Sequence, residues 1–97
     1  MSRFRANRDL GAIWDFIARN SVDAAERVEA EFYETFASLG RMPGQGFRRT
    51  DLTKKSLRFF PLYSYLIVYQ PDANPVRIVA VLRGNRNLKR LLKARSL

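Results

Sequence analysis

Three arginines are the residues of this sequence best suited to chemistry on an anionic substrate. Arg58, Arg83 and Arg86 lie in or just beyond apolar stretches, and their guanidinium groups could converge on one phosphate. Cleaving a phosphodiester also needs a general base and a general acid. The chain has no histidine, and its only carboxylate side chains beyond residue 34 are Asp51 and Asp72. We therefore assign no catalytic residue and expect a binding protein rather than an enzyme, since a nuclease would need a lysine or tyrosine with a shifted pKa.

The residues that hold metals and phosphate-bearing cofactors are also missing from the sequence. The chain has no cysteine and no histidine, which excludes thiolate zinc sites and iron–sulfur clusters. Gly44 and Gly46 follow Pro43 and precede no evident helix, so they indicate a turn rather than a phosphate-binding loop. We expect no metal site and no cofactor.

Nothing in the sequence indicates a membrane protein or a secreted one. No apolar run approaches the roughly 18 residues that span a bilayer. The N-terminal residues MSRFRANRDL lack the apolar centre of a signal peptide. We therefore expect no membrane partner and a cytoplasmic location.

The net charge of +9 is concentrated in one part of the chain. Residues 1–40 hold five basic and seven acidic side chains, a net of −2, whereas residues 41–97 hold thirteen basic and two acidic side chains, a net of +11. A field of that size attracts an anionic partner. Nucleic acid, an acidic protein segment and a membrane surface are the anionic partners that such a charge favours. Direct binding of nucleic acid is secondary, because the sequence has no recognition-helix signature and its helical half is acidic.

The first forty residues show the apolar period of two helices. The first stripe consists of Leu10, Ile13, Trp14 and Ile17, and it predicts a helix over about 8–19. The second stripe consists of Ala25, Val28, Phe32, Phe36 and Leu39. A cap at Asn20 or Ser21 begins the second helix and Gly40 ends it. The short connection predicts an antiparallel helical hairpin.

After residue 40 the apolar period changes to two, which is typical of strands. Strands are predicted over 56–60, 63–70 and 76–82, with the last two paired as a hairpin. A further short strand over Ser2–Arg5 fits the pattern as well. The tail from Arg83 holds six basic residues and no acid, and a short helix there could be pinned to the body by Leu88, Leu91 and Leu92.

This order of elements predicts an α+β fold with two layers, in which the N-terminal helical hairpin packs on a small antiparallel β-sheet. We expect one domain over 1–97, with the hairpin over about 8–40, the sheet over about 52–83 and a basic tail over 84–97. The hairpin should cover one face of the sheet. The other face should be basic, because it would be flanked by Arg48, Arg49, Lys54, Lys55, Arg58, Arg77 and Arg83.

Several segments, taken in order, carry a resemblance to a known family. They are DLGAIWDFIA (9–18), AAERV (24–28), the Arg58-x-Phe60 pair, YLIVY (65–69) and IVAVLRGNRNL (78–88). Their order and spacing resemble the ParE toxins of the ParE/RelE superfamily, which are the toxin halves of bacterial type II toxin–antitoxin modules. The opening segment favours the ParE branch over the RelE branch.

The resemblance implies a cofactor-free toxin that serves plasmid stabilisation and inhibits growth by acting on DNA gyrase. It also implies a cognate antitoxin whose extended acidic segment wraps the toxin. Residues expected to contact the antitoxin are Phe16, Arg48, Arg49, Arg58 and Arg77. Residues expected to contact the target are Arg83, Arg86, Lys89, Arg90 and Lys93.

The alternative function is that of a RelE-like endonuclease that cuts mRNA on the ribosome. The sequence also departs from the family, because only Ser2–Arg8 precede the Asp-Leu motif and Asn87 stands where an acidic residue is common. The identity of the antitoxin, the choice between gyrase and another topoisomerase, and the oligomeric state stay open at this point.

Overall fold

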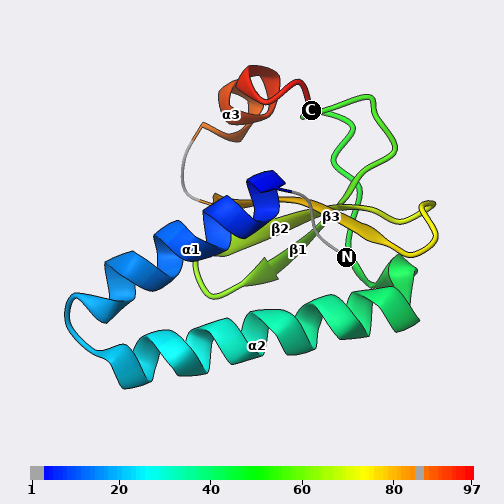
Figure 1. The fold of residues 1–97 in the computed structure, drawn as a ribbon. Helices are drawn as coiled ribbons and strands as arrows, with labels where there is room; N and C mark the ends of the chain where they lie inside the picture. The colour runs from blue at the N-terminus through cyan, green and yellow to red at the C-terminus, as the bar shows by residue number, and fades with distance from the viewer. Residues whose placement is uncertain (1–3, 85–86) are drawn as a thin grey trace.

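The fold is that of a computed structural model, which describes residues 4–84 and 87–97 (Figure 1). The helical hairpin and the antiparallel sheet are both present, and the predicted α+β fold is confirmed. In chain order the elements are α1 (Phe4–Ala18), α2 (Val22–Arg41), the short 3-10 helix η1 (Pro43–Gln45), β1 (Arg58–Leu62), β2 (Tyr65–Gln70), β3 (Arg77–Arg83) and α3 (Leu88–Ala94).

Helix α1 begins at Phe4, which is earlier than the sequence pattern indicates. The strand suggested over Ser2–Arg5 is therefore wrong for Phe4 and Arg5; Ser2 lies outside the described residues. The physical reason is that Ala6 continues the apolar stripe of Leu10 by one turn and is buried with it in the core. An added helical turn buries Ala6, which a strand at this position would not do.

Helix α2 starts as predicted and ends one residue later than predicted. The Ser21 hydroxyl accepts a hydrogen bond from the backbone N–H of Ala24 at 3.1 Å, so Ser21 is the N-cap. The helix continues through Gly40 to Arg41, and the Met42 N–H donates to the carbonyl oxygen of Ser38. The predicted stop at Gly40 is wrong, since no described glycine adopts a positive φ. Pro43, which lacks an N–H donor, follows the helix instead.

The three strands form an antiparallel sheet in the order β1-β2-β3. Strands β1 and β2 pair up to Leu62 and Tyr65, which leaves Tyr63 and Ser64 as a two-residue turn. Tyr63 has a φ of 56°, the left-handed conformation that such turns require. This turn is why β2 begins at Tyr65 and not at residue 63. Strand β1 runs over Arg58–Leu62, so the predicted bounds 56–60 are wrong and residues 48–57 form a loop before the sheet.

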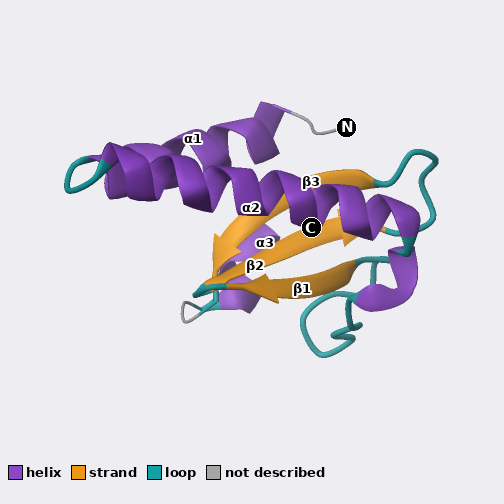
Figure 2. Ribbon diagram, turned by 90° about the horizontal axis from the view of Figure 1, so that it is seen from below, coloured by secondary structure: helices purple, strands orange, loops and turns teal. Residues whose placement is uncertain are grey.

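One face of the sheet packs against α1 and α2, as Figure 2 shows from below. Ile67 and Tyr69 of β2 and Ile78 of β3 point into this core, where they meet Phe32 and Leu39 of α2. All five side chains are almost completely buried. The helical hairpin therefore buries its apolar stripe on the sheet, as predicted.

The other face of the sheet is apolar and covered, and the expectation of an open basic face is wrong. Leu66, Val68 and Leu82 point to this side and form a second buried cluster with Phe59 of β1 and Leu92 of α3. The physical reason is the uninterrupted apolar run of β2, which buries side chains on both faces and so needs cover on both. Figure 1 shows α3 on the side of the sheet away from α2.

The loop that leads from η1 to β1 is tied to the sheet by one buried tyrosine. The Tyr69 hydroxyl donates to the carbonyl oxygen of Pro43 at 2.7 Å and accepts from the N–H of Gly46 at 2.8 Å. A Cβ atom at Gly46 would lie 2.6 Å from that hydroxyl and 2.8 Å from the Phe59 carbonyl oxygen, so only glycine fits. Phe47 then pairs with Phe59 through two backbone hydrogen bonds, which fixes the start of the 48–57 loop.

Candidate cationic interface

Helix α3 presents its leucines to the sheet and its cations to solvent. The Asn87 side chain accepts from the backbone N–H of Arg90 at 3.2 Å and caps the helix. Leu92 is 1% exposed, whereas Lys89 and Lys93, one turn apart, are exposed. The predicted pinning of the basic tail by its leucines is therefore present in the structure.

The end of the chain contacts the 48–57 loop, which is distant in sequence. The Thr53 hydroxyl donates to the backbone oxygen of Leu97 at 2.6 Å, and the Lys55 ammonium donates to the carbonyl oxygen of Ser96. Figure 1 shows the C-terminus beside this loop. These bonds bring the lysines of the loop to the lysines of α3.

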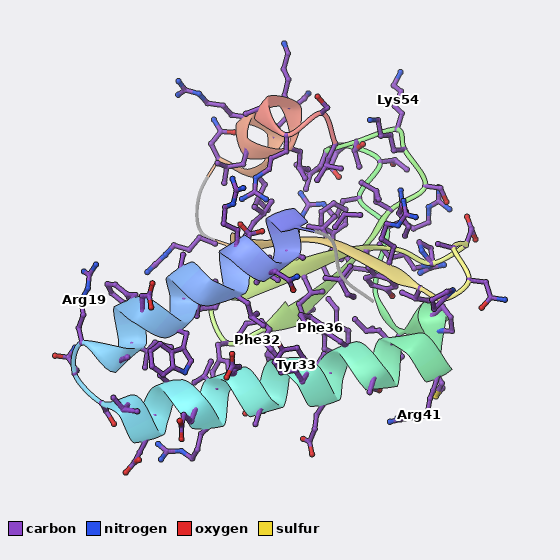
Figure 3. The ribbon with its side chains drawn as sticks, viewed as in Figure 1. Arg19, Phe32, Tyr33, Phe36, Arg41 and Lys54 are labelled. Atoms are coloured by element: carbon purple, nitrogen blue, oxygen red, sulfur yellow. The ribbon has the colours of Figure 1, made fainter. Side chains whose placement is uncertain are left out.

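A cleft of about 420 Å³ lies between the loop and the tail. We call it the lysine cleft; its lining residues are Leu52, Thr53, Lys54, Lys55, Lys89, Lys93, Ser96 and Leu97. In Figure 3, Lys54 extends from the loop on the α3 side of the sheet. Two of the predicted target-binding residues, Lys89 and Lys93, thus share a site with two lysines that the sequence analysis did not assign to it.

An ion pair fixes the end of α3 to the rest of the fold. Arg95 donates two hydrogen bonds to the Asp9 carboxylate of α1, at 2.6 and 2.9 Å. The same carboxylate accepts from the backbone N–H of Val81 in β3 at 2.9 Å. The bonds to Asp9 raise the pKa of Arg95 above its usual value, so this guanidinium stays charged. One side chain thereby joins α1, the β3 edge and the tail.

The remaining predicted target-binding residues do not form one group with the lysine cleft, because Arg83 contacts a ring that packs in the core on the hairpin side of the sheet. The Arg83 guanidinium lies 5.8 Å from the centre of the Tyr65 ring, in a cation–π contact. Arg90 is exposed on α3. Arg86 lies outside the described residues.

The residues predicted to contact an antitoxin do not form one cluster. Phe16 is 53% exposed at the hairpin end of α1, under the guanidinium of Arg19. Arg48 follows the opposite end of α2, a helix of 20 residues that is about 30 Å long. Arg58 donates to the Gly46 carbonyl oxygen at 2.7 Å. A partner that touched both ends would have to run along the length of the molecule.

Two more of these arginines differ in whether a carboxylate of the chain already binds them. Arg49 is bound in a bidentate pair by Asp51, at 2.7 and 2.8 Å. Arg77 is exposed at the start of β3. Arg77 is therefore accessible to an acidic partner, whereas Arg49 would have to exchange one carboxylate for another.

The groups considered for acid–base chemistry are engaged in other contacts. Hydrogen bonding to Arg49 lowers the pKa of Asp51, so this carboxylate stays charged. Asp72 accepts from the Ser56 hydroxyl at 2.7 Å. The Tyr63 hydroxyl donates to Glu31, and this bond raises the pKa of Tyr63. The lowered pKa of Asp51 and the raised pKa of Tyr63 both favour the ordinary protonation state of these two groups.

Residues 4–84 and 87–97 contain no group of three or more histidine, cysteine, aspartate or glutamate residues that could hold a metal ion. No helix in this part of the chain is long and apolar enough to cross a membrane.

The chain is similar to one known protein family and to a solved structure. Residues 4–88 match the family described as "ParE toxin of type II toxin-antitoxin system, parDE". A solved structure of the chromosomal ParDE TA system from P. aeruginosa superposes with a TM-score of 0.69 at 19% sequence identity. The match covers 84% of this chain and 90% of the other, which shows a shared fold. No curated protein sequence matches the chain.

Proposed function

Since the chain belongs to the ParE toxin family of type II toxin–antitoxin systems, we propose that it inhibits bacterial growth by binding DNA gyrase and that a cognate antitoxin neutralises it. The observation that supports a binding mechanism is the gathering of lysines on one side of the sheet, at the lysine cleft. The exposed carboxylates Asp23, Glu26 and Glu34 lie on α2, across the sheet. A dipolar molecule of this kind presents its cationic side to an acidic protein surface.

Gyrase inhibition is tested by adding the purified protein to gyrase and relaxed plasmid. We expect loss of supercoiling in proportion to toxin, with translated mRNA left intact. Cleavage of mRNA on the ribosome without any effect on supercoiling would instead establish the RelE-like function. Expression with and without the neighbouring reading frame tests neutralisation, because growth should recover only when both proteins are made.

The antitoxin is proposed to contribute an extended acidic segment. It would contact the exposed Arg48 and Arg77 and the half-buried Arg58, and it would compete with Asp51 for Arg49. Phe16 gives it an exposed apolar contact at the hairpin end. The ParDE designation of the P. aeruginosa structure supports a partner of this type.

Association of toxin and antitoxin should be fast at low salt and slow at high salt. The +11 net charge of residues 41–97 steers an acidic partner, and salt screens that attraction. We expect the association rate, measured by stopped-flow fluorescence, to fall by about tenfold between about 50 and 500 mM NaCl. The dissociation rate should change much less. An association rate that is independent of salt would contradict the electrostatic part of the proposal.

The exposed cations of α3 are proposed to contact the target. Replacing Lys89, Arg90 and Lys93 with alanine should remove toxicity and gyrase inhibition while antitoxin binding stays within about threefold. Folding should be preserved, since removing an exposed charge changes stability by about 0.5 kcal/mol or less.

A charge-matched control separates a specific contact from a general loss of positive charge. Arg19, Arg27 and Arg41 are exposed on the helical hairpin, and Figure 3 shows Arg19 and Arg41 at its two ends. Their triple alanine variant loses the same charge and should stay toxic. Equal toxicity of the α3 variant and the parent, at matched expression, would remove α3 from the mechanism.

A further inference from the structure

The lysine cleft combines an apolar floor with a cationic rim. Leu52 of the loop and Leu97 of the tail are half-buried and line the floor. Lys54, Lys89 and Lys93 are exposed around it. Apolar surface in a hollow favours an apolar ligand group, and ammonium groups around it favour an anion. A ligand that fits must therefore carry both features within a few ångströms.

The rim keeps a positive excess after the local contacts are counted. Lys55 donates to the Ser96 carbonyl oxygen, which is a neutral acceptor. The positive charge of Lys89 helps to lower the pKa of Asp51, so the two groups are close. The Asp51 carboxylate, however, accepts two hydrogen bonds from Arg49. Within residues 4–84 and 87–97 the ion pairs are Arg49–Asp51 and Arg95–Asp9, and neither uses a lysine of the cleft.

We propose that the lysine cleft docks an acidic, extended segment of a partner protein, with one leucine-sized side chain inserted between Leu52 and Leu97 and carboxylates placed against Lys54, Lys89 and Lys93. The proposal rests on the proposed function in one respect, which is that the partner is the target rather than the antitoxin. It goes beyond that function because it names Lys54, Leu52 and Leu97 as contacts.

The chemistry of the cleft favours a peptide over a nucleic acid. Single-stranded nucleic acid is held by aromatic side chains that stack on bases and by arginines that grip phosphates. The lining contains neither an aromatic residue nor an arginine. The apolar floor consists of leucines rather than aromatic rings, so it suits an aliphatic side chain better than a base. The occupant is therefore an acidic peptide segment with an aliphatic residue at its centre.

The position of the cleft also favours an open, extended occupant. The Thr53–Leu97 hydrogen bond at 2.6 Å joins the loop to the tail at the cleft. Its rim comes from two elements, the 48–57 loop and α3, with Lys54 on one and Lys93 on the other. A segment lying between them would meet cations on both sides and the leucines below.

The proposal is tested with synthetic fluorescent peptides as probes, by anisotropy titration of the full chain. The first peptide has four glutamates flanking a central leucine; the second has asparagine in place of that leucine; the third has glutamines in place of the glutamates. We expect the second and third to bind at least about fivefold more weakly than the first, because each lacks one of the two features. A single-stranded oligonucleotide of equal charge should bind more weakly than the first peptide.

Charge-reversal variants locate the binding site. The double variant Lys54→Glu/Lys93→Glu should lower the affinity for the first peptide by at least about tenfold. The double variant Arg19→Glu/Arg41→Glu, which has the same change in net charge, should lower that affinity by about threefold or less. Amide shifts of Thr53, Ser96 and Leu97 in NMR spectra of the parent protein should move on adding the first peptide. Circular dichroism checks that both variants are folded.

The outcomes separate this proposal from the proposed function. Equal weakening by both double variants, equal binding of the leucine and asparagine peptides, or preference for the oligonucleotide would each overturn the docking proposal. Peptide binding at the cleft by a protein that leaves gyrase active would support the cleft and refute the gyrase function. Gyrase inhibition that survives Lys54→Glu/Lys93→Glu unchanged would refute the cleft as a target contact and leave the function standing.

Discussion

Replacing Phe32 with alanine should lower the free energy of unfolding by about 3–5 kcal/mol. Phe32 is fully buried, and its ring packs 6.1 Å from that of Phe36 and 6.0 Å from that of Tyr65, measured between ring centres. Figure 3 shows its side chain between α2 and the sheet. The variant loses buried apolar surface and leaves a cavity where the two layers of the fold meet. The loss is a large fraction of the roughly 5–15 kcal/mol that stabilises a typical domain.

Urea unfolding followed by circular dichroism measures this loss. The neighbouring Tyr33 provides the control, because it is 45% exposed and its ring meets that of Phe36 in a T-shaped contact. Tyr33→Ala should cost about 1 kcal/mol. Similar midpoints for Phe32→Ala and the parent protein would show that Phe32 is not at the centre of the core.

Replacing Asp9 with alanine should lower the free energy of unfolding by about 2–4 kcal/mol. The side chains of Asp9 and Arg95 are 11% and 26% exposed, so the variant leaves a partly buried guanidinium without its carboxylate. It also removes the acceptor of the Val81 N–H. The lower end of the range reflects the partial exposure of Arg95, since water screens part of the interaction.

The control is Asp15→Ala, an exposed carboxylate on the same helix, which should change stability by about 0.5 kcal/mol or less. Hydrogen exchange at Val81 should accelerate only in Asp9→Ala. Because the pKa of Arg95 is raised, the stabilisation is complete below the pKa of an unfolded arginine and is lost only as pH rises above it. The loss in Asp9→Ala should therefore be equal at about pH 6 and pH 8; a strong dependence on pH in that window would contradict the proposed ion pair.

The secondary structure and one face of the core were predictable because they depend on short-range periodicity. Leu10, Ile13 and Ile17 recur at helical spacing, and that spacing alone places them on one side of a helix. The aromatic and β-branched run in β2 likewise predicts a strand whatever surrounds it. Boundaries were less predictable, because Gly40 stays helical and the pairing of β1 with β2 places the turn at Tyr63.

Composition also determined that the chain has a cationic half, and the spacing of Leu88 and Leu92 indicated that the tail docks on the body. The tertiary structure decided what that tail docks against. It covers the second face of the sheet, which the sequence analysis had expected to be basic. It also brings residues together that no local pattern connects, with Asp9 and Arg95 separated by 86 positions and Thr53 and Leu97 by 44. Such contacts arise only when helix, strand and tail pack on one another, because hydrogen bonds and ion pairs act over a few ångströms and leave no period in the sequence.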